Sequence, residues 1–187
     1  IPNLRCDLGE GLLWNETKNS LMMTDINNCL LIEVNIDTYE TKVLTLPEPV
    51  AWINLTDQDG IYILGLKSGI AIISTESSGK LDWLHREFPL RDDCRLNDSF
   101  VDQDGRLWYG SMNFKDETSL DGQLASFDSQ EGFKLHDSGF TVTNGPIVSP
   151  DGSSLYLNDT LNGIIYRYRL SLKKDALSHR EVFVRFR

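Results

Sequence analysis

The chain has 187 residues, of which 40% are hydrophobic and 25% carry charged side chains, a composition typical of a globular protein with a sizeable core. Its formal net charge of −10 at pH 7 argues against binding to nucleic acids or to anionic membranes, which both attract basic surfaces. No apolar run approaches the ~18 residues that a membrane-spanning helix needs.

The cysteines are few and irregularly placed. Cys6, Cys29 and Cys94 are odd in number and lack the Cys-x-x-Cys spacing. They therefore predict neither a disulfide framework nor a zinc site. Reduced thiols of this kind favour a cytoplasmic location.

Near the start of the chain, Glu10 stands between Gly9 and Gly11. Two glycines permit unusual backbone angles on either side of this residue. Such a bend can point a carboxylate into a cavity. The alternative is an ordinary solvated glutamate in a turn.

Short apolar segments follow, separated by turns. The first three predicted strands are Ser20–Asp25, Cys29–Asn35 and Thr41–Leu46. A proline-containing linker leads to a second group, which covers 50–55, 61–66, 70–75 and 80–88, with a turn at Ser77–Gly79 before the last of them. No stretch has a sustained helical period, so the order strand, turn, strand predicts β-meanders.

The third group of strands begins with the polar segment Cys94–Asp98. In a strand, Arg95 and Asn97 point to one face and Asp98 points to the other. Arginine offers a fork of donors and asparagine offers both a donor and an acceptor, which suits a polyhydroxylated or carboxylate-bearing small molecule. The alternative is a structural loop held by an Arg–Asp pair.

The fourth group opens with 141–146, which contains Asn144, 47 residues after Asn97, and ends with a strand at 181–186 that follows a polar connection at residues 173–175. An Asp-Gly turn before an apolar strand recurs with the same period. Its glycines are Gly60, Gly105 and Gly152, spaced by 45 and 47 residues, and Asn19 takes the same place 41 residues before Gly60. Four near-equal periods predict a β-propeller or a similar repeat array.

The predicted fold is all-β and forms one propeller domain, with blades at roughly 1–47, 48–92, 93–140 and 141–187. Equivalent positions on neighbouring blades meet at one mouth of the central channel, so we expect Glu10, Asn97, Arg95 and Asn144 there. A carboxylate with amide oxygens suits one hard divalent cation, Ca²⁺ or Mg²⁺ and also Mn²⁺ or Zn²⁺. Metal-assisted hydrolysis is the chemistry that this set favours.

Three segments carry a family resemblance: LGEGLLW at 8–14, RLNDSFVDQDGRLWYGSM at 95–112 and TNGPIVSPDGSSLYLNDT at 143–160. Together they resemble the SMP-30/gluconolactonase/luciferin-regenerating-enzyme family of regucalcin-like lactonases, over nearly the whole chain. The resemblance implies a six-bladed propeller, about four blades of which are present, with one divalent metal in its channel. It also implies a small-molecule substrate, a sugar lactone or a related cyclic ester.

Carried over by position, Glu10 and Asn144 match metal ligands, and Arg95 and Asn97 match the pair that contacts substrate. Asp159 matches a family position at the end of a strand, whose residue is structural or contacts the side chains that bind metal and substrate. Lys115 stands near a place where some members have an acidic substrate contact, which leaves the lactone preference open.

The family's remaining metal ligand is an aspartate that also acts as general base. At a period of ~45 residues it is expected just beyond Arg187, and six blades need roughly 270 residues, so we expect this chain to be incomplete at its C-terminal end. No catalytic residue is therefore assigned within it. The alternative function is a non-catalytic calcium-binding or protein-interaction propeller. The sequence specifies neither the lactone, the native metal nor the oligomeric state.

Overall fold

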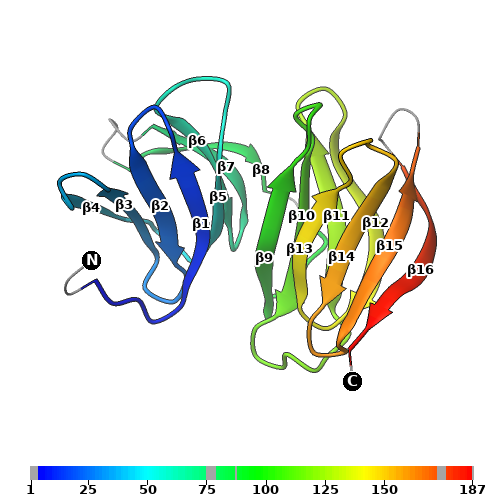
Figure 1. Ribbon diagram of the computed structural model, residues 1–187. Coiled ribbons are helices and arrows are strands. Elements are labelled where there is room, and N and C mark those ends of the chain that lie inside the picture. Colours follow the sequence, from blue (N-terminus) through cyan, green and yellow to red (C-terminus); the bar gives the residue numbers. More distant parts are fainter. Residues whose placement is uncertain (1–3, 75–78, 87, 172–175, 187) are drawn as a thin grey trace. The chain divides into compact units, whose positions relative to one another are not determined.

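The computed structural model describes residues 4–74, 79–86, 88–171 and 176–186, which form β-strands and no helix (Figure 1). The first sheet consists of β1 (Gly9–Asn15), β2 (Ser20–Asp25), β3 (Leu30–Asn35) and β4 (Thr41–Thr45). The second consists of β5 (Val50–Leu55), β6 (Ile61–Leu66), β7 (Gly69–Ser74) and β8 (Leu81–His85).

The third sheet consists of β9 (Cys94–Val101), β10 (Leu107–Asn113), β11 (Gly122–Asp128) and β12 (Gly132–Phe140). The fourth consists of β13 (Thr143–Val148), β14 (Ser154–Asp159), β15 (Ile164–Leu170) and β16 (Leu177–Arg185). Each sheet pairs its strands antiparallel in chain order, so the predicted meanders and the all-β class are confirmed. The described segments contain no helix long and apolar enough for a membrane crossing.

Strand ends differ from the sequence prediction by a few residues. Cys29 has a φ of +56° and precedes β3, because it belongs to the left-handed turn before that strand. β8 is shorter than the predicted segment 80–88. The turn predicted at Ser77–Gly79 and the connection at 173–175 fall wholly or mostly outside the described residues.

The chain forms two compact units, residues 1–89 and 90–187. Each contains two sheets with an apolar core between them, as expected for sheets whose inner faces interdigitate. The core of the first unit includes Met22, Leu31, Val50, Ile53, Tyr62 and Leu64. That of the second includes Trp108, Leu124, Phe140, Leu155, Leu157 and Tyr168.

The recurring turn has the same backbone in every sheet. Gly60, Gly105 and Gly152 have φ angles of +75°, +81° and +70°, and Asn19 has +48°. A left-handed φ excludes most side chains but suits glycine and is tolerated by asparagine. The sequence places Asn19 where the other three repeats have the turn glycine, and its left-handed φ confirms that assignment.

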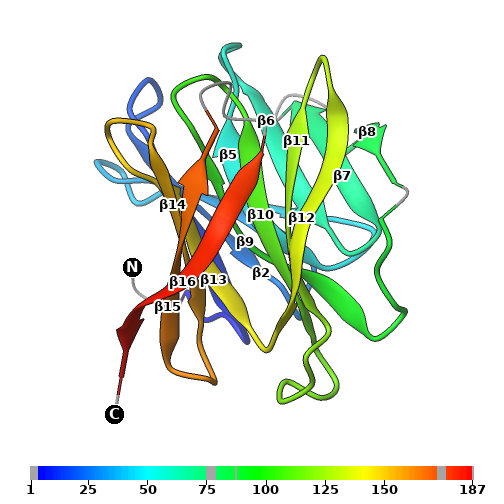
Figure 2. The ribbon, with the colours of Figure 1, turned by 90° about the vertical axis from the view of Figure 1, so that its right-hand side faces the viewer.

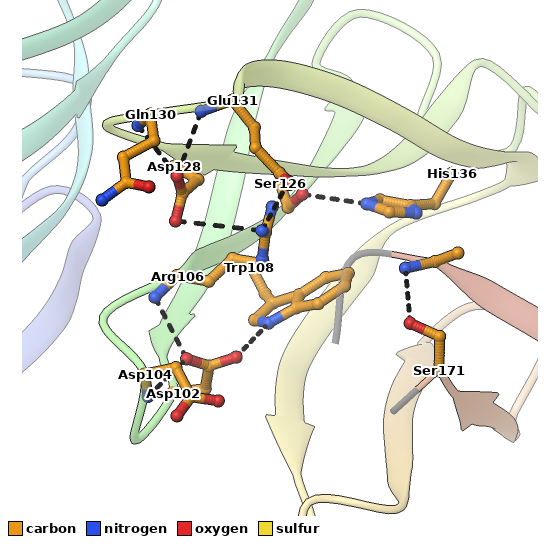
Figure 3. Close-up of polar contacts among 11 residues, drawn as sticks. Asp102, Asp104, Arg106, Trp108, Ser126, Asp128, Gln130, Glu131, His136 and Ser171 are labelled. Carbon is orange, nitrogen blue, oxygen red and sulfur yellow. Dashed lines mark hydrogen bonds and ion pairs between the residues drawn. The ribbon is translucent and has the colours of Figure 1, made fainter. Parts of the chain in front are cut away.

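Asp102 holds this turn together in the third sheet, as Figure 3 shows. Its Oδ1 accepts hydrogen bonds from the amides of Asp104 and Arg106, both at 3.0 Å, and its Oδ2 accepts one from Trp108 Nε1 at 2.9 Å. Trp108 is fully buried, so this bond satisfies an indole N–H that water cannot reach. The carboxylate thus ties the turn to the core of the second unit.

The two sheets of the second unit are also joined at their outer strands, which Figure 2 shows from the side. The guanidinium of Arg180 on β16 lies 4.5 Å from the ring centroid of Phe140 and 4.0 Å from that of Tyr166. Asp137 on β12 accepts a hydrogen bond from Tyr168 on β15 at 2.8 Å. These contacts hold the third and fourth sheets together at their outer strands, while β9 and β13 contact each other directly.

Candidate functional site

The first strand of three sheets is irregular where the sequence predicts a functional side chain. The register of β1 on β2 shifts just after Glu10, and that of β13 on β14 shifts just after Asn144. The register of β9 on β10 shifts between Leu96 and Ser99, a stretch that contains Asn97. Such β-bulges re-aim side chains and are frequent beside active sites.

Glu10 is exposed on β1, in the unit of residues 1–89. Its neighbour Gly11 has a φ of +59°, and a Cβ there would lie 3.1 Å from the Cα of Trp52. The bend predicted from the glycines is therefore present at Gly11, where both the backbone angle and the close approach to β5 require glycine. The Glu10 carboxylate accepts no hydrogen bond from the described residues, so it is available to a ligand.

Arg95, Asn97 and Asn144 form a continuous chain of hydrogen bonds in the unit of residues 90–187. Arg95 Nη1 donates to Asn97 Oδ1 at 2.7 Å, which places the two side chains on one face of β9, as predicted. Asn97 Nδ2 donates to Asn144 Oδ1 at 2.9 Å. The structure thus brings three of the four predicted ligand and substrate residues together.

The orientation of Asn144 depends on a residue that the sequence did not reveal. Its Nδ2 donates to Thr160 Oγ1 at 2.7 Å, just beyond the end of β14. With the amide nitrogen held there, Oδ1 faces Asn97. Thr160 lies within the third family-like segment, but a threonine in a turn gives no sequence signal of such a role.

Asp159, at the end of β14, is fully buried. Its carboxylate accepts a hydrogen bond from the Thr141 amide at 3.0 Å, one from the Thr141 hydroxyl, and one from Asn162 Nδ2 at 2.8 Å. These bonds fasten the start of β13 to the end of β14. The supporting or structural role predicted for Asp159 stays a prediction.

Asp25, at the end of β2, has the same arrangement in the first unit. It is fully buried and accepts hydrogen bonds from the Asp7 amide at 3.0 Å, the Leu8 amide at 3.2 Å and Asn28 Nδ2 at 2.8 Å. Burial raises the pKa of Asp25, but these hydrogen bonds outweigh it and the pKa is lowered overall. In each unit an aspartate at the end of a second strand therefore anchors the segment before the first strand of its own sheet, β1 for Asp25 and β13 for Asp159.

A separate cluster consists of Asp93, Cys94 and Asp121, whose ligand atoms lie within 4.8 Å of one another. Arg91 already pairs with it, since its guanidinium donates to both oxygens of Asp93 at 3.1 and 3.0 Å and lies 3.8 Å from Asp121. Hydrogen bonds from Arg91 lower the pKa of Asp93, and burial raises that of the Cys94 thiol. A protonated thiol beside a paired guanidinium is a poor metal site.

Lys115 lies on the exposed loop after β10, where its amide donates to Asn113 Oδ1 at 2.9 Å. The loop is further tied by Asn113 Nδ2, which donates to Asp121 at 2.9 Å. The loop backbone is thus held by a side chain of β10, while the Lys115 side chain extends from an exposed position.

The donor set fits a hard divalent cation. Asn144 Oδ1 accepts one hydrogen bond, and an amide oxygen has a second lone pair for a ligand. Glu10 supplies an unpaired carboxylate on the other unit, and its convergence with Asn144 stays a prediction. Carboxylate and carbonyl oxygens are the ligands that Ca²⁺ and Mg²⁺ prefer.

The sequence matches the family described as SMP-30/Gluconolactonase/LRE-like region over residues 8–187. A 6-deoxy-6-sulfogluconolactonase from Pseudomonas putida is 31% identical over 164 residues, which cover 87% of this chain and 55% of that protein. The chain therefore spans little more than half the length of this relative.

Two solved structures are similar in fold. A luciferin-regenerating enzyme gives a TM-score of 0.88 at 21% identity, covering 97% of this chain and 62% of that one. A calcium-binding protein, regucalcin, from Agrobacterium tumefaciens gives 0.84 at 22% identity, covering 96% and 60%. The predicted propeller family and the resemblance drawn from the three segments are confirmed.

Proposed function

The chain belongs to the SMP-30/gluconolactonase/LRE-like family, and from this premise we propose that the whole protein hydrolyses a sugar lactone or a related cyclic ester with the help of one divalent cation. One observation supports the proposal most directly. The side chains of Arg95, Asn97 and Asn144 form one hydrogen-bonded chain across two strands, in or beside the register shifts of β9 and β13.

Each residue has a role that follows from its chemistry. Arg95 and Asn97 bind the ring hydroxyls, since together they offer several donors and an amide oxygen as acceptor. Their mutual hydrogen bond fixes both side chains before substrate arrives, which reduces the entropy lost on binding.

Asn144 and Glu10 would hold the cation, with Asn144 oriented by Thr160. A bound divalent cation supplies a positive charge that polarises the lactone carbonyl and stabilises the negative charge on its oxygen during attack by water. The aspartate expected beyond Arg187 as general base stays a prediction, as does a cytoplasmic location.

The lactonase of Pseudomonas putida supports lactones as the substrate class. The test is hydrolysis of a panel of aldonolactones and aryl esters, followed by proton release in weakly buffered solution, before and after treatment with EDTA. We expect turnover of at least one lactone, loss with EDTA and recovery with a divalent salt. A folded whole protein that hydrolyses no lactone in a metal-dependent way would refute the proposal, and faster hydrolysis of aryl esters would reassign it as an esterase.

A non-catalytic calcium-binding propeller is the second candidate, favoured by the calcium-binding regucalcin among the similar structures. Replacing Glu10 by Gln separates the two. If the protein is an enzyme, Glu10→Gln lowers both cation affinity and turnover, whereas a binding protein loses cation affinity and has no turnover to lose. Glu16→Gln is the matched control, because Glu16 is also exposed and follows the same strand.

A further inference from the structure

Asp98 joins the two strands that carry the candidate site. It follows Asn97 in the irregular stretch of β9. Its Oδ2 accepts a hydrogen bond from the Gly145 amide on β13 at 2.7 Å, and its Oδ1 accepts one from the Ser99 amide at 2.8 Å. Bonds to an ionised carboxylate are shorter and stronger than those between neutral groups.

Gly145 lies where the ladder of β13 on β14 is interrupted. It follows Asn144 at the bulge of β13, has a φ of +53°, and has no pairing partner on β14 in that register. Its N–H is displaced from the strand ladder, and the Asp98 carboxylate accepts it in place of water, which can reach this exposed residue. The left-handed turn at Gly145 sets the direction of the chain directly after Asn144.

Asn144 is thereby held from two sides. Asn97 and Thr160 fix its side-chain amide, and Asp98 fixes the peptide that follows it. Two successive residues of β9 bind two successive residues of β13, both at an offset of 47 residues. The pair Asn97-Asp98 therefore matches the pair Asn144-Gly145 contact for contact.

We propose that Asp98 is a positioning residue for Asn144: it holds the Gly145 peptide so that Asn144 Oδ1 is oriented to bind the cation. The proposal rests on the proposed function for the use of the cation. It does not make Asp98 a ligand, because the carboxylate acts through Gly145. Partners that orient a metal ligand typically change metal affinity by about 10- to 100-fold.

The first experiment measures the Kd for Ca²⁺ by titration calorimetry on the whole protein. We expect Asp98→Ala to raise the Kd about tenfold or more, and Asp98→Asn, which keeps an acceptor oxygen, to raise it less. Asp92→Asn removes the same charge from an exposed position six residues earlier and should leave the Kd unchanged. If Asp98→Ala binds Ca²⁺ as tightly as Asp92→Asn does, the proposal is wrong.

A double-mutant cycle distinguishes positioning from direct ligation. If Asp98 acts through Asn144, removing it from an Asn144→Ala protein changes the Kd no further. If the two losses multiply instead, Asp98 acts independently of Asn144 and the proposal is overturned.

A second readout needs no metal. Amide hydrogen exchange should be slow at Gly145 and should accelerate at least tenfold in Asp98→Ala, while Asp98→Asn, the variant closest in shape, keeps part of the protection. An unchanged exchange rate at Gly145 in both variants overturns the positioning role whether or not Ca²⁺ binds. Absence of Ca²⁺ binding by the unaltered protein, with the exchange effect present, refutes the metal part of the proposed function and leaves the Asp98–Gly145 role supported.

Discussion

Replacing Asp159 by Ala should destabilise the unit of residues 90–187 strongly. The change leaves the Thr141 amide and hydroxyl without their acceptor, and Thr141 is itself buried. A buried donor left unsatisfied costs about 1–3 kcal/mol, and the hydroxyl can rotate toward another acceptor, so we expect a loss of about 3 kcal/mol in all. Since domains are stable by only about 5–15 kcal/mol, such a loss is easily measured.

The assay is equilibrium unfolding in urea, followed by tryptophan fluorescence in a protein whose Trp14, Trp52 and Trp83 are replaced by Phe in every variant compared. The signal then comes from Trp108, the one tryptophan of residues 90–187, which lies in the core of that unit. Asp159→Asn keeps one acceptor oxygen and should cost about 1 kcal/mol. Asp92→Ala, at an exposed position, is the control for lost charge. The reasoning is refuted if Asp159→Ala and Asp92→Ala unfold at the same urea concentration.

Three further predictions concern the first unit. Gly65→Ala should destabilise it by about 1–3 kcal/mol in urea unfolding, because the new Cβ would lie 2.0 Å from Trp52 Cε2. Gly60→Ala is the comparison, since it strains a left-handed backbone without such a clash, and a smaller loss in Gly65→Ala than in Gly60→Ala would contradict the prediction. The pKa of Asp25 is lowered in the folded protein, so the stability that its carboxylate contributes is present above its unfolded pKa of about 3.9 and is lost as the pH falls through the folded pKa. The difference in unfolding free energy between the unaltered protein and Asp25→Asn should therefore shrink between pH 7 and pH 2. A difference that stays constant over this range would contradict the prediction. Glu10→Gln should weaken Ca²⁺ binding at least tenfold without lowering Tm, because its carboxylate accepts no hydrogen bond within the part of the chain that the structure describes. A drop in Tm with unchanged binding would assign Glu10 to the fold instead.

The sequence was sufficient for the features that depend on local chemistry. An Asp-Gly turn needs a left-handed residue, and the same requirement identified Asn19 in the first repeat, which has no glycine there. The apolar segments between turns gave most of the strands, with errors at strand ends, such as Cys29. β1 (Gly9–Asn15) was not predicted as a strand, because its two glycines indicate a bend rather than a strand. The period then placed Asn97 and Asn144 at equivalent positions, and the structure joins them.

Contacts between residues distant in the sequence were harder to predict. Asp98 was expected to point away from Arg95 and Asn97, and a strand pattern gives no information on what it meets there. The partner is a backbone amide, that of Gly145, and amides carry no residue-type signal. Thr160 is a similar case, since its role depends on the orientation of the Asn144 side chain.

The second repeat shows why the position itself does not define the function. Trp52, like Asn97 and Asn144, stands eight residues before the turn glycine of its repeat. It pairs with Gly65 across β5 and β6, as Asn144 pairs with Asn158 across β13 and β14. Yet Trp52 is buried, because Gly65 leaves space for the indole against its backbone.

One structural position therefore holds an indole in the second repeat and amides in the third and fourth. The difference lies in the residue opposite and in the bulge. At Trp52 the extra residue precedes the side chain, whereas at Asn144 it follows, and there the displaced Gly145 amide donates to the carboxylate of Asp98. The Asp98–Gly145 bond is accordingly a consequence of the bulge that orients Asn144, and a repeat without that bond can use the same position for packing.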